Sequence, residues 1–572
     1  MPPRVATDVL LVFGLGALII GAGLGLRDPW PPDEPRFALM ARDMALSGQW
    51  LFPLRAGELY ADKPPLFMWL IGAGYRLTGS LRVAFLLPGL LAGLATLLLV
   101  YDLGRRLWDR RGGLAAALLL LATVQFTLYA RSGQIDPVLT LWTTLALYGL
   151  LRHLLRGPQW GWYYCGWAAA GFGIITKGVG FLPLLMLLPY GYVRLRGWSA
   201  PAGGGWKWVA GPLCLVLAAS VWLAPMLLAV QASGAADLTA YRNEILLGQT
   251  IDRYLGPRGH LNPPWYFPVE VIPLFWLPLS ALLPWLVPRW AADFEHRDAR
   301  QLLLLGWTAL VIVFFTLSPA KRGVYVLPAL PAVALAAAPH LPGLLGHQAV
   351  KRLALGLSVA AALLLALNLL YFRVLEPAAG AGIESDHGVV PWTPLGSLLL
   401  AFVTVIVATR LRHAVTGSAL MIAVCWLIAG WWLFPVVSPA ASGERFMDQV
   451  EAALDAEQAL GIVRFKEKFL LHAQRRVTHF GYRRADIAQE LADAAAWLAQ
   501  SPWRRVLVGE HGWQACFDAA QSRHIARTSG RDWYLVSRAR PRCAAGGVAA
   551  RSIGYLAGAS HLRRGGSAQG GD

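Results

Sequence analysis

Acidic and basic side chains gather in a few short stretches of this 572-residue chain. RDPWPPDEPRF (27–37) places Asp33 beside Glu34 between prolines, and LYADKPPL (59–66) brings a tyrosine, an acid and a lysine together. Further stretches surround Asp136, Lys177, His260 and the run Lys321, Arg322 and Tyr325. Carboxylates can take a proton from an acceptor hydroxyl. Lysine and arginine can bind a phosphate and stabilise its charge as a leaving group.

The rest of the chain is apolar enough to predict a polytopic helical membrane protein. Hydrophobic residues make up 56% and charged residues 15%, whereas soluble proteins carry about a quarter charged residues. Apolar runs of a length that suits a bilayer recur up to about residue 437. We expect about thirteen spans, at 8–26, 82–103, 113–130, 138–155, 163–176, 179–193, 209–230, 266–288, 301–317, 324–339, 353–372, 395–409 and 415–437.

The loops between these runs alternate in charge, which predicts an orientation. Short basic loops such as GRRLWDRRGG (104–113) are typical of the cytoplasmic side. The intervening segments, with 27–81 as the first loop, and the chain after 437 are then expected outside. We read the first run as a retained span rather than a signal peptide. The net charge of +18 suggests a nucleic-acid partner only weakly, since the basic residues are dispersed in loops; we expect none.

The chain after residue 437 has the pattern of a small α/β domain, which we place at 438–545. Residues 486–500 have apolar positions at helical spacing, and 504–510 and 532–538 resemble strands. A further pair of strands is expected within 460–473, and a disordered tail at 546–572. Cys516 and Cys543 would be able to pair in an oxidising compartment; the sequence leaves this open.

Each candidate residue also has an ordinary structural explanation. Asp136 would cap a helix, Lys177 would snorkel from a span end, and His260 would be an ordinary loop histidine. Lys321 and Arg322 would contact lipid headgroups, and Asp33 with Glu34 would form a solvated turn. They do not explain why acids and bases share one membrane face while the spans stay almost free of charge. That distribution favours an enzyme acting on a lipid phosphate. A lipid or solute transporter would carry ionisable residues near span centres, and a non-catalytic envelope scaffold is the third hypothesis.

The motifs and their order resemble a known family. PDEPRFALMARDMALSGQWLFP and YADKPPLFMWL are similar to motifs of bacterial membrane glycosyltransferases related to protein O-mannosyltransferases and to the 4-amino-4-deoxy-L-arabinose transferase of lipid A. Asp136, Lys177–Gly178, PPWYF and KRGVYVLP follow in the family's order. The ordered motifs cover about residues 8–335, and the span plan extends the resemblance to about 437.

The resemblance implies roles for individual residues. Asp33 matches the family's catalytic acid, and Glu34 and Asp136 its other acidic positions. Substrate-binding positions are expected at Arg36, Tyr60, Lys63, Lys177, Lys321, Arg322 and Tyr325. Asp62 and His260 match positions that hold a divalent metal ion in some relatives. Three departures leave the sugar and the acceptor open: Phe37 and the last residue of PWYF replace tyrosine, and Asp62 replaces the commoner glutamate.

The expected protein is therefore an all-α polytopic membrane protein of the C-type glycosyltransferase fold with a small C-terminal α/β domain. Residues 1–437 would form the transmembrane glycosyltransferase part in the bacterial inner membrane, among membrane lipids. On the periplasmic face, it would move a sugar from a polyprenyl phosphate donor to a lipid A, glycan or protein acceptor.

Overall fold

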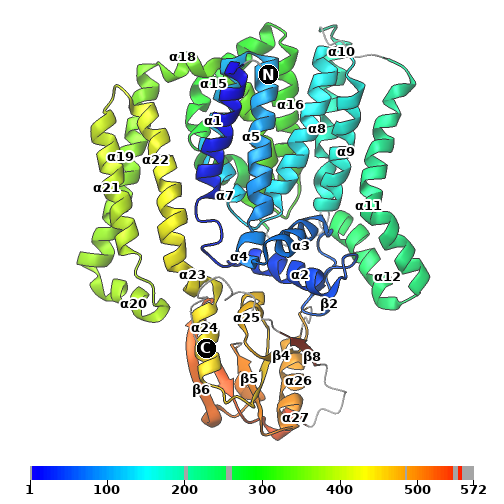
Figure 1. Ribbon diagram of the computed structural model, residues 1–572, viewed down its shortest axis with the longest axis vertical. Helices are drawn as coiled ribbons and strands as arrows, with labels where there is room; N and C mark the ends of the chain where they lie inside the picture. Colours follow the sequence, from blue (N-terminus) through cyan, green and yellow to red (C-terminus); the bar gives the residue numbers. More distant parts are fainter. Residues whose placement is uncertain are drawn as a thin grey trace, which may run out of the picture.

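A bundle of long helices makes up most of the molecule, and a smaller α/β part lies at one end of it (Figure 1). The computed structural model describes residues 3–198, 204–252, 261–482, 486–509, 511–544 and 552–556. Within these residues, ten helices are long and apolar enough to cross a membrane, or twelve when two bent pairs count as one span each. The expected thirteenth span is α9 (Trp160–Thr176), a shorter helix of 17 residues that is not among these.

The bundle is built from segments that follow the expected runs. In chain order they are α1 (Pro3–Gly21), α5 (Leu87–Leu107), α6 (Arg110–Ala122), α7 (Val124–Ala130), α8 (Asp136–Arg156), α9, η1 (Gly178–Met186), α10 (Leu187–Leu195), α11 (Ala210–Ser233), α12 (Ala236–Asn243), α14 (Ile272–Phe275), α15 (Leu279–Glu295), α16 (Ala299–Leu317), η5 (Gly323–Ala329), α17 (Leu330–Ala337), α18 (Leu341–Leu345), α19 (Gln348–Leu370), α20 (Pro377–His387), α21 (Trp392–Thr409), α22 (Ala414–Ile428) and α23 (Phe434–Ser442).

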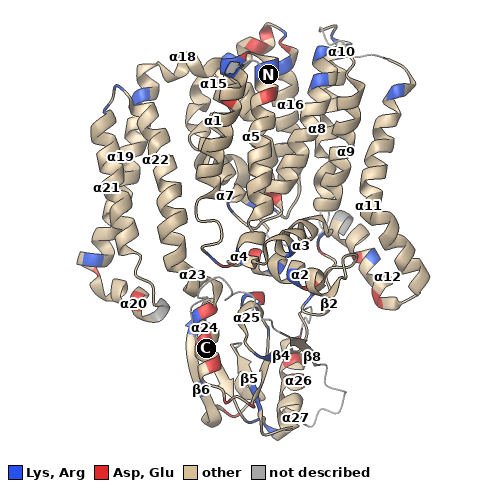
Figure 2. Cartoon of the chain, in the orientation of Figure 1, with Lys and Arg blue, Asp and Glu red and all other residues tan. Residues whose placement is uncertain are grey.

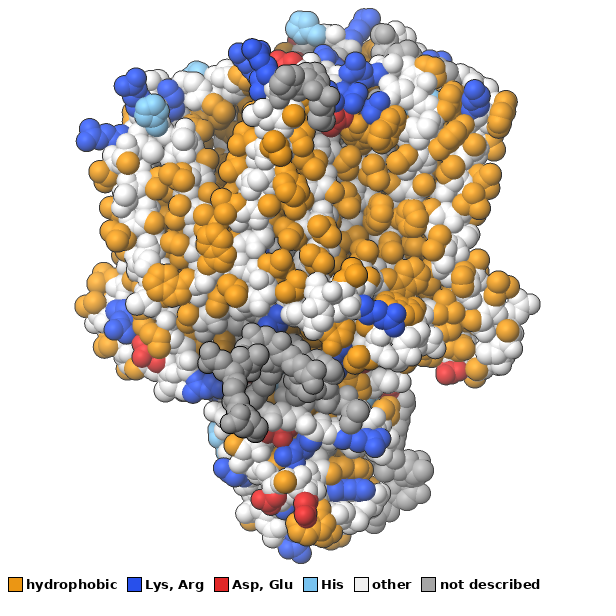
Figure 3. Space-filling model, viewed as in Figure 1, with side chains coloured by type: hydrophobic (Ala, Val, Ile, Leu, Met, Phe, Trp, Pro, Cys, Tyr) orange, Lys and Arg blue, Asp and Glu red, His pale blue; other side chains and the backbone are white. Residues whose placement is uncertain are grey.

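The outer surface of this bundle suits lipid. Charged side chains lie mostly towards the two ends of the long helices (Figure 2), and hydrophobic side chains cover the middle (Figure 3). On α11, for example, Leu213, Val216, Leu217 and Val221 are all more than half exposed. Leucine and valine on an outward helix face are stable in hydrocarbon but costly in water. The chain is a multi-pass membrane protein.

The first loop is folded. It contains α2 (Glu34–Ser47), a hairpin of β1 (Leu54–Arg55) and β2 (Glu58–Leu59), α3 (Leu66–Thr78) and α4 (Leu81–Ala84). The sequence suggests that 35–47 lies flat in the membrane interface, but the apolar stripe of α2 is buried inside the protein. It packs against α3 and against α25 (Glu467–His472) of the C-terminal part.

A six-stranded sheet forms the core of the C-terminal part. Its order is β6-β7-β5-β3-β4-β8, with β3 parallel to β4 and β5 and the other pairs antiparallel. The strands are β3 (Ala459–Ile462), β4 (Arg476–His479), β5 (Arg504–Val508), β6 (Ser522–Thr528), β7 (Arg531–Val536) and β8 (Ile553–Leu556). The helices are α24 (Glu444–Ala452), α25, α26 (Ile487–Ala499) and α27 (Pro541–Ala544).

Two expectations for this part are wrong, although α26, β5 and β7 confirm the helix and both strands nearest to them. Within 460–473 only the beginning is a strand, since β3 ends at Ile462 and Phe469 and Leu470 are buried on helix α25. The predicted disordered tail contains β8, which pairs with β4. The Tyr555 hydroxyl on β8 also bonds Asp43 and Arg42 of α2, which fixes this strand against the first loop.

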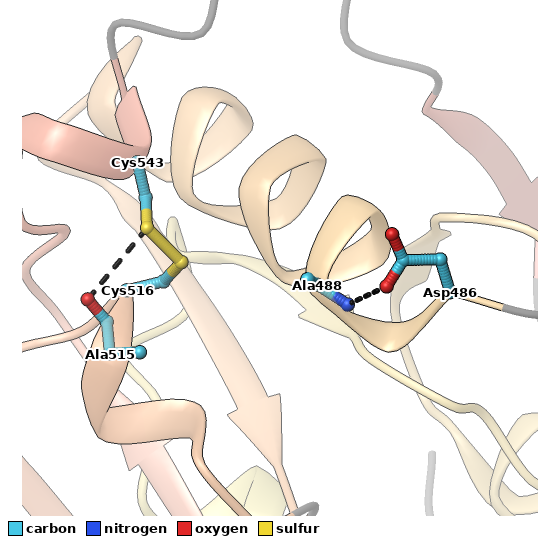
Figure 4. The surroundings of a disulfide bond; sticks show 5 residues. All are labelled: Asp486, Ala488, Ala515, Cys516 and Cys543. Carbon is cyan, nitrogen blue, oxygen red and sulfur yellow. Dashed lines mark hydrogen bonds between the residues drawn. A yellow bond between two sulfur atoms is a disulfide. The ribbon is translucent and has the colours of Figure 1, made fainter.

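A disulfide joins Cys516 to Cys543 and so ties α27 to the segment after β5 (Figure 4). The pairing left open by the sequence is therefore made. Nearby, the Asp486 carboxylate accepts a hydrogen bond from the Ala488 amide at 2.8 Å and caps α26.

Candidate active site

A cavity of about 500 Å³ lies where the first loop meets the ends of several bundle helices. The segments that line it are far apart in the sequence and converge because each charged residue lies at the end of a helix. The cavity brings together every predicted site residue of the described chain except Glu34. These residues are Asp33, Arg36, Tyr60, Asp62, Lys63, Asp136, Lys177, Lys321, Arg322 and Tyr325. His260 lies outside the described residues.

The helix ends place these side chains outside the apolar spans. Asp33 stands at the N-cap position of α2, yet the described residues show no side-chain cap bond there. Asp136 is the first residue of α8 and does not cap it either. Lys177 lies between α9 and η1, and Lys321 and Arg322 precede η5. Charges at such ends avoid the cost of burial in hydrocarbon.

Ion pairs connect these elements across the cavity. Arg322 Nη2 lies 2.7 Å from Asp33 Oδ2, and Lys177 Nζ lies 2.5 Å from Asp136 Oδ1. Lys177 Nζ also lies 4.6 Å from the centre of the Tyr325 ring. These contacts replace the capping, snorkelling and headgroup explanations for Asp136, Lys177 and Arg322 with contacts inside one site.

Two lysines of the cavity donate hydrogen bonds to backbone carbonyl groups. Lys321 Nζ donates to the Asn262 carbonyl at 2.9 Å, and Lys63 Nζ donates to the Asp62 carbonyl at 2.8 Å. Lys321 is 3% exposed, and burial lowers the pKa of its ammonium group. A buried lysine held by a neutral carbonyl gains strongly from an added anion.

The balance of charge makes the cavity suited to an anion. Its described lining has five cations, Arg36, Lys63, Lys177, Lys321 and Arg322, against three acids, Asp33, Asp62 and Asp136. Burial raises the pKa of Asp33, but Arg322, Arg36 and Lys177 outweigh it and hold that pKa below its ordinary value. The Asp33 carboxylate is therefore ionised at neutral pH, and the excess of cations remains available for a phosphate.

Glu34 faces elsewhere. Its carboxylate accepts two bonds from Arg27, at 2.6 and 2.7 Å, and one each from the Trp30 and Gly133 amides. Glu34 is 5% exposed and is absent from the described lining of the cavity. Four hydrogen bonds leave this carboxylate little capacity for a substrate, so its geometry favours holding the loop before α2.

The predicted divalent metal site rests on one described residue. Within the parts of the chain that the structure describes, no three histidine, cysteine or acidic side chains gather as ligands. Asp33 and Asp136 are already paired with cations, and hard metal ions need several oxygen ligands. The pair of Asp62 and His260 stays a prediction, since His260 lies outside the described residues.

Sequence reasoning missed three residues that shape the site. Asn262 bonds Lys321 through both its carbonyl and its side-chain amide, and Gln134 lines the cavity. Their polar character within external loops was a weak signal. Glu467 bonds the cavity residue Arg36 at 3.1 Å from the C-terminal part. No sequence signal connects two residues 431 positions apart.

Comparison with known proteins identifies the family of this chain. The family model for dolichyl-phosphate-mannose-protein mannosyltransferase matches residues 62–223. An undecaprenyl phosphate-alpha-4-amino-4-deoxy-L-arabinose arabinosyl transferase of Pseudomonas savastanoi pv. phaseolicola is 30% identical over 441 residues, 74% of this chain and 78% of the relative. The chain belongs to this arabinosyl transferase family.

Other relatives extend the comparison. The transferase of the same name from Pseudomonas aeruginosa is 34% identical over 359 residues, or 62% of this chain. That alignment spans 61% of the length of the Pseudomonas aeruginosa relative. The crystal structure of ArnT from Cupriavidus metallidurans bound to undecaprenyl phosphate superposes with a TM-score of 0.68 at 21% identity, covering 93% of this chain and 98% of ArnT. The apo structure gives 0.67. This confirms the predicted C-type glycosyltransferase fold.

Proposed function

We propose that the protein transfers a sugar from undecaprenyl phosphate to lipid A at the periplasmic face of the bacterial inner membrane. The observation that carries the proposal is the cation-rich cavity with an ionised Asp33, set at the edge of the lipid-facing bundle. Family membership supports the reaction type, because the relatives are named as arabinosyl transferases that use an undecaprenyl phosphate-linked sugar.

A second hollow beside the main cavity supports a polyprenyl donor. It has a volume of about 100 Å³, shares Lys63, Lys177 and Tyr325 with the main cavity, and is otherwise lined largely by apolar side chains such as Phe181 and Phe315. A phosphate bound by the shared lysines would place the first isoprene units against this apolar wall. The lipid chain would then remain in the bilayer while the sugar reaches Asp33.

The charge state of Asp33 supports a phosphate acceptor. A carboxylate with a lowered pKa is a weak base, so it takes a proton from the monoanion of a phosphate acceptor more readily than from a neutral hydroxyl. The bond between the sugar C1 and the donor phosphate oxygen breaks, and a bond from C1 to the acceptor oxygen forms. Undecaprenyl phosphate leaves with the electron pair, and any proton on the attacking oxygen passes to Asp33.

We take 4-amino-4-deoxy-L-arabinose, the sugar in the relatives' name, as the sugar transferred. Of the two aromatic departures, Phe267 is fully buried and does not belong to the described cavity lining. Phe37 does line the cavity, packed edge-on against Phe67 at 5.2 Å between ring centres. Only the change at Phe37 is therefore placed to affect the sugar.

The test is transfer by the purified protein in detergent, with undecaprenyl phosphate-linked aminoarabinose as donor and lipid A as acceptor, followed by mass spectrometry. Asp33→Asn should lower the rate about a hundredfold or more without loss of expression. Asp298→Asn is the matched control, because Asp298 pairs with Arg300 at the beginning of α16, whose opposite end leads to Lys321 in the cavity. A fully active Asp33→Asn protein would disprove the role of Asp33, and a wild-type protein that transfers no sugar would disprove the function.

A further inference from the structure

We propose that Glu467, in the C-terminal part, is a positioning residue that holds Arg36 in the cavity and away from full contact with Asp33. This inference rests on the proposed function, which it deepens. It makes the C-terminal part a contributor to the active site rather than a cap over it.

Glu467 lies at the beginning of α25, which packs directly on α2, the helix that carries Arg36 (Figure 1). Its side chain is 8% exposed. The Glu467 Oε1 atom accepts a hydrogen bond from Arg36 Nε at 3.1 Å and forms an ion pair with Arg55 Nη2 at 2.7 Å. A buried carboxylate with two arginine partners is firmly placed.

Arg36 is shared between two carboxylates. On one side it meets Glu467, and on the other Arg36 Nη1 lies 3.7 Å from Asp33 Oδ1, beyond hydrogen-bond distance. The guanidinium group is a rigid planar fork, so fixing its Nε edge fixes the direction of its remaining donors. Burial alone would lower the pKa of Arg36. Tyr60 and Glu467 outweigh this effect and raise the pKa above its ordinary value, so the guanidinium group stays charged.

Without Glu467, Arg36 would lose its outer anion and be drawn towards Asp33. A closer Arg36 would occupy Asp33 oxygens that the acceptor needs. It would also turn the remaining Arg36 donors away from the phosphate position proposed beside Lys63 and Lys177. Both changes slow transfer, because small displacements of a binding group cost large factors in rate.

Glu467 is not needed to attach the C-terminal part. Three other contacts dock it on the first loop: His479 Nε2 lies 2.7 Å from the Ala56 carbonyl, the Tyr482 amide donates to Glu58 at 2.9 Å, and the Tyr482 hydroxyl donates to the Leu59 carbonyl at 2.7 Å. Arg55 also lies over the Tyr482 ring at 4.4 Å. A Glu467 variant should therefore keep its domain arrangement.

A double-mutant cycle tests the proposal on the full-length protein in detergent. Glu467→Gln should lower kcat/KM for sugar transfer about tenfold in the wild-type background but less than about twofold in an Arg36→Gln background. Glu467→Asp, which keeps the charge, should recover part of the loss. Glu490→Gln is the matched control, since Glu490 is a buried acid of the same domain that pairs with Arg464 and not with a cavity residue.

The outcomes separate this inference from the proposed function. An equal loss in both backgrounds would mean that Glu467 acts through the fold and would overturn the inference, as would full activity of Glu467→Gln. In either case an active wild-type protein leaves the proposed function intact. A wild-type protein that transfers no sugar would refute the proposed function and this inference with it.

Discussion

At Asp33, two opposing influences set the state of the carboxyl group. Burial favours the neutral acid, whereas the Arg322 guanidinium, 2.7 Å away, favours the carboxylate, and the cations prevail. The arrangement explains how a group sheltered from water can still act as a charged residue. The pKa of Asp33 therefore depends more on Arg322 than on the other cations, and Arg322 can be removed by mutation.

Arg322→Met should move the acid limb of the pH profile of kcat/KM to higher pH. The carboxylate is the active form, and its lowered pKa places that limb below the ordinary value for aspartate. Loss of the cation leaves burial to raise the pKa, although Arg36 and Lys177 still oppose it. Activity at pH 5 relative to pH 8 should therefore fall in the variant.

The shape of the profile, rather than the absolute rate, is the measurement, because Arg322 also lines the cavity. Arg300→Met provides the control: Arg300 pairs with Asp298 at the opposite end of the bundle, so its removal should leave the profile in place. An unshifted limb in Arg322→Met would show that Asp33 does not control the rate.

Adjacent residues can have opposite uses, as Glu34 illustrates. The sequence places it beside Asp33 and gives no means to separate the two carboxylates. In the structure Asp33 faces the cavity, while Glu34 turns back to Arg27 and to two backbone amides. Successive residues at a helix start point in different directions, so adjacency in sequence did not predict a shared role.

At the scale of elements, the sequence predicted what depends on local composition. Apolar runs located the bundle helices, and the spacing in 486–500 predicted α26. The sequence did not predict elements whose formation or burial depends on partners distant in the chain. Strand β8 forms because it pairs with β4 and contacts α2. Helix α2 is buried because α25 packs against it.

The candidate site was likewise only partly predictable from the sequence. Helix ends on one membrane face are bound to lie at similar depth, so the charged stretches were expected near one another. Their pairing was not predictable, because it depends on how the ends turn inward: Lys177 reaches Asp136 across 41 positions, and Arg322 reaches Asp33 across 289.

The Cys516–Cys543 bond is the element whose removal should affect the C-terminal part alone. It closes a loop with a sequence separation of 27 residues, for which loop-closure entropy predicts a loss of about 3–4 kcal/mol. Cys516→Ser with Cys543→Ser should lower the temperature at which this part unfolds. Circular dichroism or tryptophan fluorescence with and without reductant measures the effect.

Cys165→Ser is the control for that experiment, since Cys165 is a free cysteine on α9. Reductant should shift the midpoint of the wild-type protein and of the control, and it should not shift the double variant. A reductant-insensitive wild-type protein would show that the bond does not form or does not stabilise the fold.

At the scale of the whole molecule, the cavity and the C-terminal part share one end of the bundle, and the short basic loops occupy the other (Figures 1 and 2). Basic loops favour the cytoplasmic side, and a disulfide persists in an oxidising compartment such as the periplasm. Both considerations favour the proposed periplasmic location of the cavity end. This agreement between charge and redox chemistry supports the proposed orientation.

Reporter fusions should confirm that orientation in cells. Alkaline phosphatase, which folds only outside the cytoplasm, should be active when fused after Ala544 and inactive when fused in the basic loop at 104–113, because the two points lie at opposite ends of the bundle. A green fluorescent protein reporter exported in an unfolded state should give the reverse pattern. Activity of phosphatase at 104–113 would invert the topology, and it would place the cavity on the side where a periplasmic acceptor cannot reach it.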